Sequence, residues 1–397
     1  MKYLVHAIQT RGLIFLVYLS NFFLSFHYFT TAYVNSSFLG NNIPQAIADH
    51  LISGLYILAS ILNIFIFLYA PELLRHIGNY KLALWLSVLD LLAVWGLAYT
   101  TDIAYILPLF VIHQAIVPVI LFNLDIFLEH CTKDENLTGE FRGLFLTVTN
   151  VALVISPLLL AAIGLSKGDF SPAYLLSGMF LVPFILIIGF TLRSFEDPHY
   201  HPLQLQHEID VFIKNRNINS VFIANFILQL FYSWMVIYMP LYLINTVGLS
   251  WEQFGLMLTI ALLPFALFEL PIGTLADKKF GEKEIMAFGF IITAASLFAI
   301  SYFDDLRLSV LTLLLFLSRT GAAFIEITTE SYFFKKTKES DADLVSTFRI
   351  SRPFSYVVGP LLGGFTLLFL PYQHMFSILG LVMVCGLFFV FRITDTR

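Results

Sequence analysis

Five ionisable side chains lie in or beside segments that are otherwise apolar enough for lipid, namely Arg319, Glu326, Glu330, Arg349 and Arg352. Charged groups are costly inside a bilayer, so they face protein or water when they occur there. Arg319, Glu326 and Glu330 are spaced i, i+7 and i+11, which places them on one face of a helix. A guanidinium on such a face can bind a carboxylate or phosphate, and a desolvated carboxylate can take up a proton. This face is therefore the first candidate for function.

The elements that position these charges must be membrane helices. Of the 397 residues, 58% are hydrophobic and only 12% are charged, and the mean hydropathy is +0.82. A soluble domain of this size could not cover its surface with such a composition. The net charge of -5 is small, and nothing in the sequence points to nucleic acid as a partner. We predict an all-α polytopic membrane protein that is surrounded by the lipid bilayer.

Twelve apolar runs reach the length of about 20 residues that a spanning helix needs. The first follows Lys2 and Arg11 and is too long for a signal-peptide core, so we expect it to remain as a helix. The predicted spans lie near residues 12–38, 47–70, 81–99, 103–129, 143–166, 173–193, 218–246, 252–275, 284–303, 307–334, 347–370 and 373–394.

The basic residues predict the orientation of these spans. Most of the 22 Lys and Arg residues fall on the side shared by the two termini, and only Lys167 and Arg307 fall in loops on the other side. Cytoplasmic loops are the ones enriched in Lys and Arg, so both termini are predicted to be cytoplasmic. We expect a multi-pass protein of a prokaryotic cytoplasmic (inner) membrane.

The sequence repeats after its middle. A charged, His- and Pro-containing stretch, residues 194–217, separates six predicted spans from six, and similar residues recur in the two halves at a nearly constant spacing. The matched pairs are Asn21 with Asn225, Gly78 with Gly281, Asp102 with Asp305, Asp125 with Glu330, Arg142 with Arg349, and Pro157 with Pro360. We predict a six-helix bundle over 1–193, a cytoplasmic linker with an amphipathic helix over 194–217, and a second bundle over 218–397; two parallel repeats are a transporter architecture.

A loop in the second half carries a family resemblance. The stretch from Gly273 to Lys283, which reads GTLADKKFGEK, resembles the loop signature G-x-L-A-D-(R/K)-x-G-(R/K)-(R/K) of the major facilitator superfamily, with one extra residue before Gly281. The resemblance covers the whole chain through topology and repeat. It implies 12 transmembrane helices in two bundles, with spans 1, 4, 7 and 10 at the centre, and alternating access by rocking of the two halves.

The resemblance also implies a cytoplasmic latch. Asp277 at a helix end can accept hydrogen bonds from a neighbouring helix N-terminus, while Gly273 and Gly281 let backbones approach. The alternative is a tight turn anchored by basic residues. The matching first-half loop, residues 71–81, keeps the glycine but lacks the aspartate, and the antiporter-like sequence GPLLGG lies in segment 11 instead of segment 5. These departures weaken an assignment to drug/proton antiport.

Polar residues inside the spans are candidates for substrate binding. Segment 2 carries a polar stripe of Asp49, Ser53, Tyr56, Ser60 and Asn63 at helical spacing, which faces either the cavity or a neighbouring helix. His27 and His113 lie near the middle of their spans and could serve in substrate hydrogen bonding, in a proton relay, or as bonded core residues. Asp90 is expected to have a structural partner. The predicted substrate-binding residues are Arg319, His27, His113, Gln114, Asn21, Tyr56, Asn225 and Gln229.

The remaining charges divide into two groups. Asp125 with Arg142 and Glu330 with Arg349 recur in both halves near the cytoplasmic ends of their spans, which favours scaffold pairs. Glu269, Glu326 and Arg352 occur only in the second half and share a predicted depth. One guanidinium cannot neutralise two carboxylates, so the surplus carboxylate is a candidate for proton coupling. The alternative is a static bridge between Arg352 and Glu326, with Glu269 permanently protonated.

Arg319 lies close to the predicted midplane, where it could clamp an anionic substrate or be held by Glu326 or a carbonyl. The linker histidines at 199, 201 and 207 suggest a metal superficially, but a surface amphipathic helix explains their pattern better. Two cysteines, Cys131 and Cys385, have no partners at disulfide or metal-site spacing. We therefore expect no metal and no cofactor.

These observations predict a secondary active transporter of a small organic solute, proton-coupled and monomeric, that works by alternating access. Two alternatives stay open. A lipid, amphiphile or drug efflux translocator on the same fold would suit the 42 phenylalanines, and a non-transporting membrane sensor is a different class. The sequence lacks the H-E-x-x-H motif and a Gly-rich phosphate loop, so we expect no enzyme.

Overall fold

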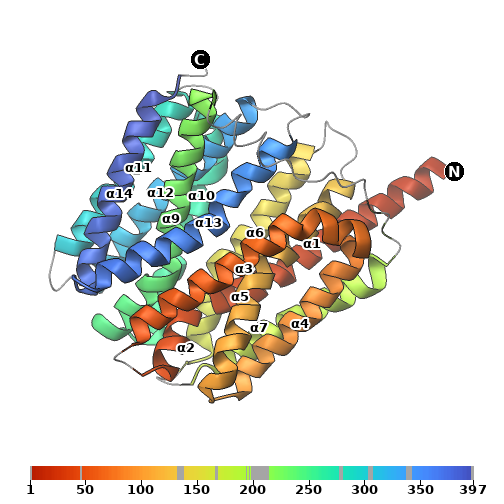
Figure 1. The fold of residues 1–397 in the computed structure, drawn as a ribbon. Helices are drawn as coiled ribbons and strands as arrows, with labels where there is room; N and C mark the ends of the chain where they lie inside the picture. The colour runs from red at the N-terminus through yellow and green to blue at the C-terminus, as the bar shows by residue number, and fades with distance from the viewer. Residues whose placement is uncertain are drawn as a thin grey trace. The chain divides into compact units, whose positions relative to one another are not determined.

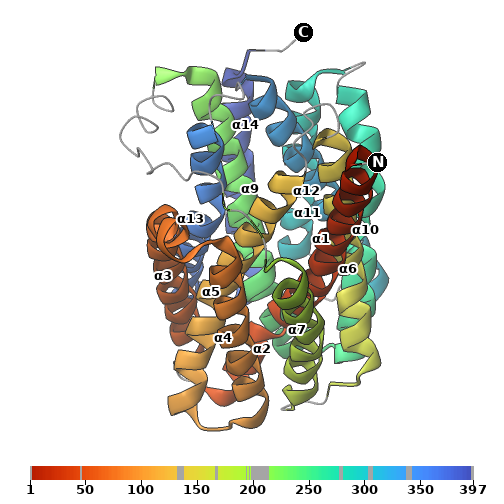
Figure 2. The same ribbon diagram turned by 90° about the vertical axis from the view of Figure 1, so that its right-hand side faces the viewer.

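Every element of the described residues is a helix (Figures 1 and 2). The computed structural model describes residues 2–44, 47–131, 138–165, 169–193, 195, 197, 214–276, 280–302, 307–336 and 342–394. The helices of the first half are α1 (Lys2–Ala32), α2 (Asn35–Asn42), α3 (Ala48–Ile77), α4 (Asn79–Tyr99), α5 (Ile103–Cys131), α6 (Thr138–Ala162) and α7 (Ser171–Thr191). Those of the second half are α9 (Arg216–Leu241), η2 (Tyr242–Thr246), α10 (Trp251–Leu275), α11 (Glu282–Tyr302), α12 (Leu308–Lys336), α13 (Ala342–Leu367) and α14 (Tyr372–Arg392).

Within the described residues, 11 helical segments are long and apolar enough to cross a membrane. The all-helical, multi-pass prediction is thereby confirmed, whereas the count of twelve spans and the orientation of the termini remain predictions. The long helix outside this group is α13, which carries Arg349, Arg352, Pro353 and Pro360 within its 26 residues. Its charged residues and prolines lower its hydropathy.

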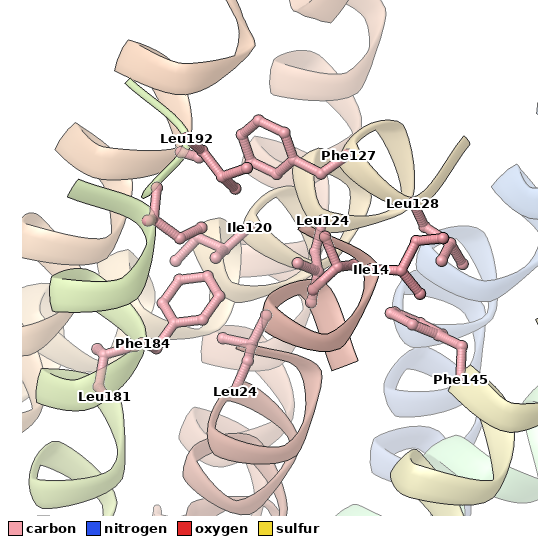
Figure 3. Close-up of a cluster of buried hydrophobic side chains, with 13 residues drawn as sticks. Ile14, Leu24, Ile120, Leu124, Phe127, Leu128, Phe145, Leu181, Phe184 and Leu192 are labelled. Carbon is pink, nitrogen blue, oxygen red and sulfur yellow. The ribbon is translucent and has the colours of Figure 1, made fainter. Parts of the chain in front are cut away.

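The chain divides into two compact units, one of residues 1–46 and 58–202 and the other of residues 47–57 and 203–397. In the first unit α1 packs on α5, α6 and α7, and α4 packs on α5 and α7. Figure 3 shows the core they share, where Leu24 of α1, Leu124 and Phe127 of α5, and Phe184 of α7 are fully buried. The apolar side chains of this core come from three different helices. Their close packing fixes these helices relative to one another, and with them the polar groups beside the core.

In the second unit α11 lies side by side with α12 and α14, and α9 packs on α12, α13 and α14 (Figure 1). Close packing here depends on glycine. A Cβ on Gly321 of α12 would lie 2.5 Å from the carbonyl oxygen of Gly289 in α11, so the two backbones touch at this point. Small residues allow such approaches between membrane helices.

The duplicated sequence pattern corresponds to duplicated local geometry. Gly78 precedes α4 with φ 84°, and Gly281 precedes α11 with φ 85°, so both matched glycines hold the left-handed conformation that disfavours other residues. The side-chain amide of Asn21 in α1 donates hydrogen bonds to two oxygens of α6, Phe145 O at 2.8 Å and Thr149 Oγ1 at 3.0 Å. Asn225 donates from α9 to Ser351 Oγ of α13 at 2.9 Å. The repeat therefore extends from sequence to hydrogen bonding. The linker helix and Asp305 lie outside the described residues, and the predicted domain boundaries stay predictions.

The first long helix of each half is interrupted. A two-residue break at Tyr33 and Val34 separates α1 from α2, and the amide of Val34 bonds the carbonyl of Thr31 at 2.9 Å. In the second half, α9 contains Pro240 near its end and continues as the π-helix η2. In transporters, interrupted helices at corresponding positions of two repeats mark binding sites. The polar groups near both breaks are therefore candidates for the site.

Candidate functional site

The charged face of α12 begins with a buried arginine. Arg319 is only 2% exposed, and the small residue Ala323, one turn further on, is buried with it. The guanidinium donates to Ser318 Oγ at 2.9 Å and contacts Met239 Sδ of α9 at 3.2 Å. Its carbon lies 5.5 Å from the ring centroid of Phe231, a cation–π contact. These three contacts are with uncharged groups, and Met239 precedes the π-helical interruption of α9 by three residues.

Two turns along the same face, Glu326 meets a tyrosine of the neighbouring helix. The Tyr232 hydroxyl donates to Glu326 Oε2 at 2.6 Å, and the Tyr232 ring lies 5.9 Å from that of Phe265 in α10. Glu330 and Arg352 both act electrostatically on this carboxylate. A short bond from a hydroxyl to a carboxylate is of the charge-assisted kind, so it depends on the protonation state of Glu326.

The other predicted charges are less enclosed. Glu330, Arg349 and Arg352 have exposed side chains within their unit. The side chains of Glu269 and Arg142 lie outside the described residues, whereas Asp125 is partly buried. The predicted scaffold pairs and the predicted static bridge of Arg352 to Glu326 therefore stay predictions.

In the first unit the two predicted histidines converge on one carboxylate. His27 of α1 and His113 of α5 are 0% and 1% exposed, and between them lies Asp90 of α4, also 0% exposed. His113 Nδ1 is 2.7 Å from Asp90 Oδ1, and His27 Nε2 is 2.7 Å from Asp90 Oδ2. The two imidazole rings meet edge to face with centroids 5.6 Å apart. The partner expected for Asp90 is thus a pair of histidines.

Each ring also has a hydroxyl on its far side. His27 Nδ1 lies 2.8 Å from Ser177 Oγ of α7, and His113 Nε2 lies 3.2 Å from Thr31 Oγ1 of α1. The three ring and carboxylate ligand atoms lie within 4.8 Å of one another, a spacing at which a metal ion could be held. The contact from His113 to Asp90 is a hydrogen bond, whereas His27 Nε2 and Asp90 Oδ2 make none with the described residues.

The remaining predicted substrate residues fall into different surroundings. Gln114, next to His113, is partly exposed and accepts from Asn35 at 3.4 Å, while the Tyr174 hydroxyl donates to Asn35 Oδ1 at 2.7 Å. Asn21 and Asn225 make the duplicated interhelical bonds described above. Gln229 is 9% exposed, and Tyr56, which belongs to the second unit, is fully buried.

The polar stripe of α3 makes hydrogen bonds to other helices. Asn63 donates to Ala115 O of α5 at 2.6 Å, within the first unit. Within the second unit, Ser53 Oγ and the Tyr238 hydroxyl are 2.8 Å apart. These bonds support the interhelical reading of the stripe at both positions.

The loop with the signature is described only in part. Asp277 lies outside the described residues, so the latch remains a prediction. Gly273 lies in the last turn of α10, and Gly281 has a φ of 85°. The next residue, Glu282, is 1% exposed, receives Ser331 Oγ at 3.3 Å and pairs with Lys335. In the first half the amide of Asn79 donates to Asp197 Oδ1 at 2.8 Å, so a carboxylate from outside that loop caps α4.

Sequence reasoning did not select four residues that complete the histidine cluster, namely Thr31, Asn35, Tyr174 and Ser177. Thr31 and Asn35 follow His27 at i+4 and i+8, a spacing that would have marked one helical face. No sequence spacing signals Ser177, because it is 150 residues from its partner.

The family model described as Major Facilitator Superfamily matches residues 221–397. A comparison with curated proteins found no match. Among solved structures, a variant of the nucleoside transporter NupG aligns with a TM-score of 0.74 and 14% identity, over 96% of this chain and 100% of that one. The POT family transporter PepTSo gives a TM-score of 0.76 and 11% identity, over 96% and 97%. The peptide transporter POT in complex with sulfate gives 0.73 and 12%, over 96% and 93%.

At identities this low, the structural matches establish the fold alone. The family model is the match at the level of sequence, and it covers the second half of the chain. The same bundle architecture covers nearly all of the chain, and the loop signature lies within the matched residues. The second half of the chain thus matches the Major Facilitator Superfamily model, and nearly the whole chain has the fold of these solved transporters.

Proposed function

We propose that this protein is a secondary active transporter of a small organic solute that couples solute movement to protons through alternating access. The match of the second half to the superfamily model and the fold of nearly the whole chain support a multi-pass membrane transporter of small solutes. The observation that carries the coupling proposal is the 2.6 Å bond from Tyr232 to Glu326, an ionisable group inside a spanning helix, on the face that also bears Arg319.

Protonation of Glu326 changes what this carboxylate can do. Ionised, it accepts the Tyr232 hydrogen bond strongly and attracts Arg352; protonated, it loses the charge on which both interactions depend. A proton thus alters how α12 is held to α9 and α13. A group whose contacts depend on its proton in this way can bias a two-state equilibrium between transport conformations.

Arg319 supplies the proposed substrate contact. Its guanidinium is buried beside the interruption of the second-half helix, where it contacts Ser318, Met239 and Phe231. A carboxylate, phosphate or polar carbonyl of a solute would complement it. Nucleosides and short peptides, which the transporters of similar fold are named for, are the first solutes to screen.

The test begins with a ligand thermal-shift screen at two pH values, followed by uptake into proteoliposomes with and without a pH gradient. We expect the gradient to drive accumulation of the stabilising solute in wild type. Glu326→Gln should abolish gradient-driven accumulation while preserving solute exchange, and Glu252→Gln, which alters an exposed carboxylate at the start of α10, should behave as wild type. Accumulation by Glu326→Gln equal to wild type would contradict the coupling role. Export of lipid analogues without solute uptake would instead favour the amphiphile translocator.

A further inference from the structure

The first unit contains a buried group of metal-ligating side chains that the Glu326 mechanism does not use. His27 of α1, Asp90 of α4 and His113 of α5 are at most 1% exposed. One ligand atom of each lies within 4.8 Å of the other two. The three residues come from separate helices and have no ligand spacing along the chain, so the sequence alone predicted no metal.

The contact between His27 and Asp90 is not a hydrogen bond. His27 Nε2 and Asp90 Oδ2 are 2.7 Å apart, yet neither atom makes a hydrogen bond with any described residue. At this distance an N–H···O bond is lost only when the ring nitrogen does not aim at the oxygen. Two fully buried polar atoms therefore lie side by side without a hydrogen between them. Such an arrangement is costly unless a further group binds both atoms, and a cation is such a group.

The far side of each ring has an oxygen that can hold the ring in the orientation of a metal ligand. A histidine that binds a metal usually donates its other ring N–H to an oxygen acceptor. His27 Nδ1 lies 3.2 Å from the carbonyl oxygen of Ser177 and 2.8 Å from its Oγ. His113 Nε2 lies 3.2 Å from Thr31 Oγ1. Both rings can therefore place their hydrogen on the far side and turn a bare nitrogen towards the shared carboxylate.

We propose that His27, Asp90 and His113 bind one divalent transition-metal ion such as Zn²⁺. Two imidazoles and one carboxylate form a ligand set that zinc sites use, and the fourth position stays open to water or a solute group. Zinc bonds to nitrogen and oxygen of about 2.0–2.2 Å place neighbouring ligand atoms about 3 Å or more apart. The two 2.7 Å contacts of Asp90 therefore need to open only slightly, and the ion replaces the hydrogen between His113 Nδ1 and Asp90 Oδ1.

The proposed ion would join three helices beside the interruption of the first span. Thr31 lies at the end of α1, where its carbonyl accepts from Val34 at the break, and Asn35 opens α2 one turn later. Asn35 in turn donates to the partly exposed Gln114 at 3.4 Å. These polar groups give an ion a route to the buried ligands that avoids the apolar core. The proposal goes beyond the proposed transport function and does not rest on it.

The test measures zinc binding by the full-length protein, purified in detergent with a tag that contains no histidine. His199, His201 and His207 of the linker are replaced by glutamine in every sample, because they could bind zinc themselves. After incubation with Zn²⁺ and gel filtration, we expect about one zinc ion per chain, with two imidazoles among ligands at about 2.0–2.2 Å in X-ray absorption at the zinc edge. Zn²⁺ alone should also raise the melting temperature, because it binds the folded state.

Substitutions at the site identify the ligands. Asp90→Asn and His113→Gln should each abolish the bound zinc. Thr31→Val removes the acceptor behind one ring and no ligand, so it should weaken zinc binding by about 10–100-fold. Thr30→Val is the matched control, at the neighbouring buried threonine whose hydroxyl donates to the carbonyl of Phe26 at 2.6 Å, and it should bind zinc as wild type does.

Three outcomes would overturn the proposal. They are a wild type that retains no zinc and shows no zinc-induced thermal shift, zinc that persists in Asp90→Asn, and equal zinc affinities of Thr31→Val and Thr30→Val. The comparison of the two threonine variants keeps the test decisive if loss of a ligand prevents folding. Since no solute or proton gradient is used, failure here is distinguishable from failure of the Glu326 experiment.

Discussion

The Tyr232 hydroxyl donates to Glu326 Oε2 across 2.6 Å, joining α9 to the charged face of α12. The bond stabilises the ionised carboxylate, so Tyr232→Phe should let Glu326 keep its proton to higher pH. A hydrogen bond to a charged group contributes about 1.5 kcal/mol or more, so the pH profile of gradient-driven uptake should move alkaline by about 1 unit. Uptake measured in proteoliposomes over a pH series checks this. A profile that stays in place would show that Glu326 does not set it.

Arg319 should be needed for solute affinity. Its planar guanidinium can bind both oxygens of a carboxylate side by side, a geometry that a lysine ammonium does not offer, so Arg319→Lys should raise the KM for uptake by about 10-fold, equivalent to about 1.4 kcal/mol. Arg319→Ala should abolish both uptake and the thermal shift caused by the solute. The melting temperature without solute serves as the control for folding. If Arg319→Ala kept transport and the solute-induced thermal shift, the substrate role would be excluded.

The sequence predicted those parts of the molecule that depend on local pattern. Apolar runs located the helices, and the loop from Gly273 to Lys283 pointed to the family, because hydropathy and backbone turns are written in neighbouring residues. His27 and His113 were recognised as costly polar groups for the same reason. That they share Asp90, and that Ser177 lies against His27, depends on packing among four helices, which no spacing along one helix encodes. The eleventh span stays a prediction, since Arg349 and Arg352 lower the hydropathy of α13.

The duplicated asparagines are expected to stabilise the fold. Asn21 donates two interhelical bonds and Asn225 one. Hydrogen bonds between membrane helices contribute about 0.6 kcal/mol on average and up to about 1.7. Asn225→Ala should therefore lower the free energy of unfolding by about 1 kcal/mol and Asn21→Ala by somewhat more, as measured by denaturant titration in detergent. Wild-type stability with lost solute binding would instead support the substrate role that the sequence predicts for them.

The core of the first unit should be sensitive to truncation. Leu124 is fully buried among side chains of α1, α5 and α7, as Figure 3 shows. Leu124→Ala should lower the free energy of unfolding by about 2–5 kcal/mol, because the removed atoms leave a cavity. Leu158→Ala, at a leucine that is 42% exposed on α6, is the matched control and should change stability far less. Equal effects of the two substitutions would show that this cluster does not act as a packed core.

Gly78 should be sensitive to alanine. Its φ of 84° is one that other residues rarely adopt, so alanine costs about 1–3 kcal/mol there. The new Cβ would also lie 2.6 Å from Asp197 Oδ2. The carboxylate would have to move, and its 2.8 Å bond from the Asn79 amide at the start of α4 would weaken. Gly78→Ala should therefore lower the melting temperature, whereas Gly12→Ala, at a helical position with open space, should have little effect. A smaller effect of Gly78→Ala in the background of Asp197→Ala would identify the carboxylate as part of the cause, and an unchanged effect would contradict this.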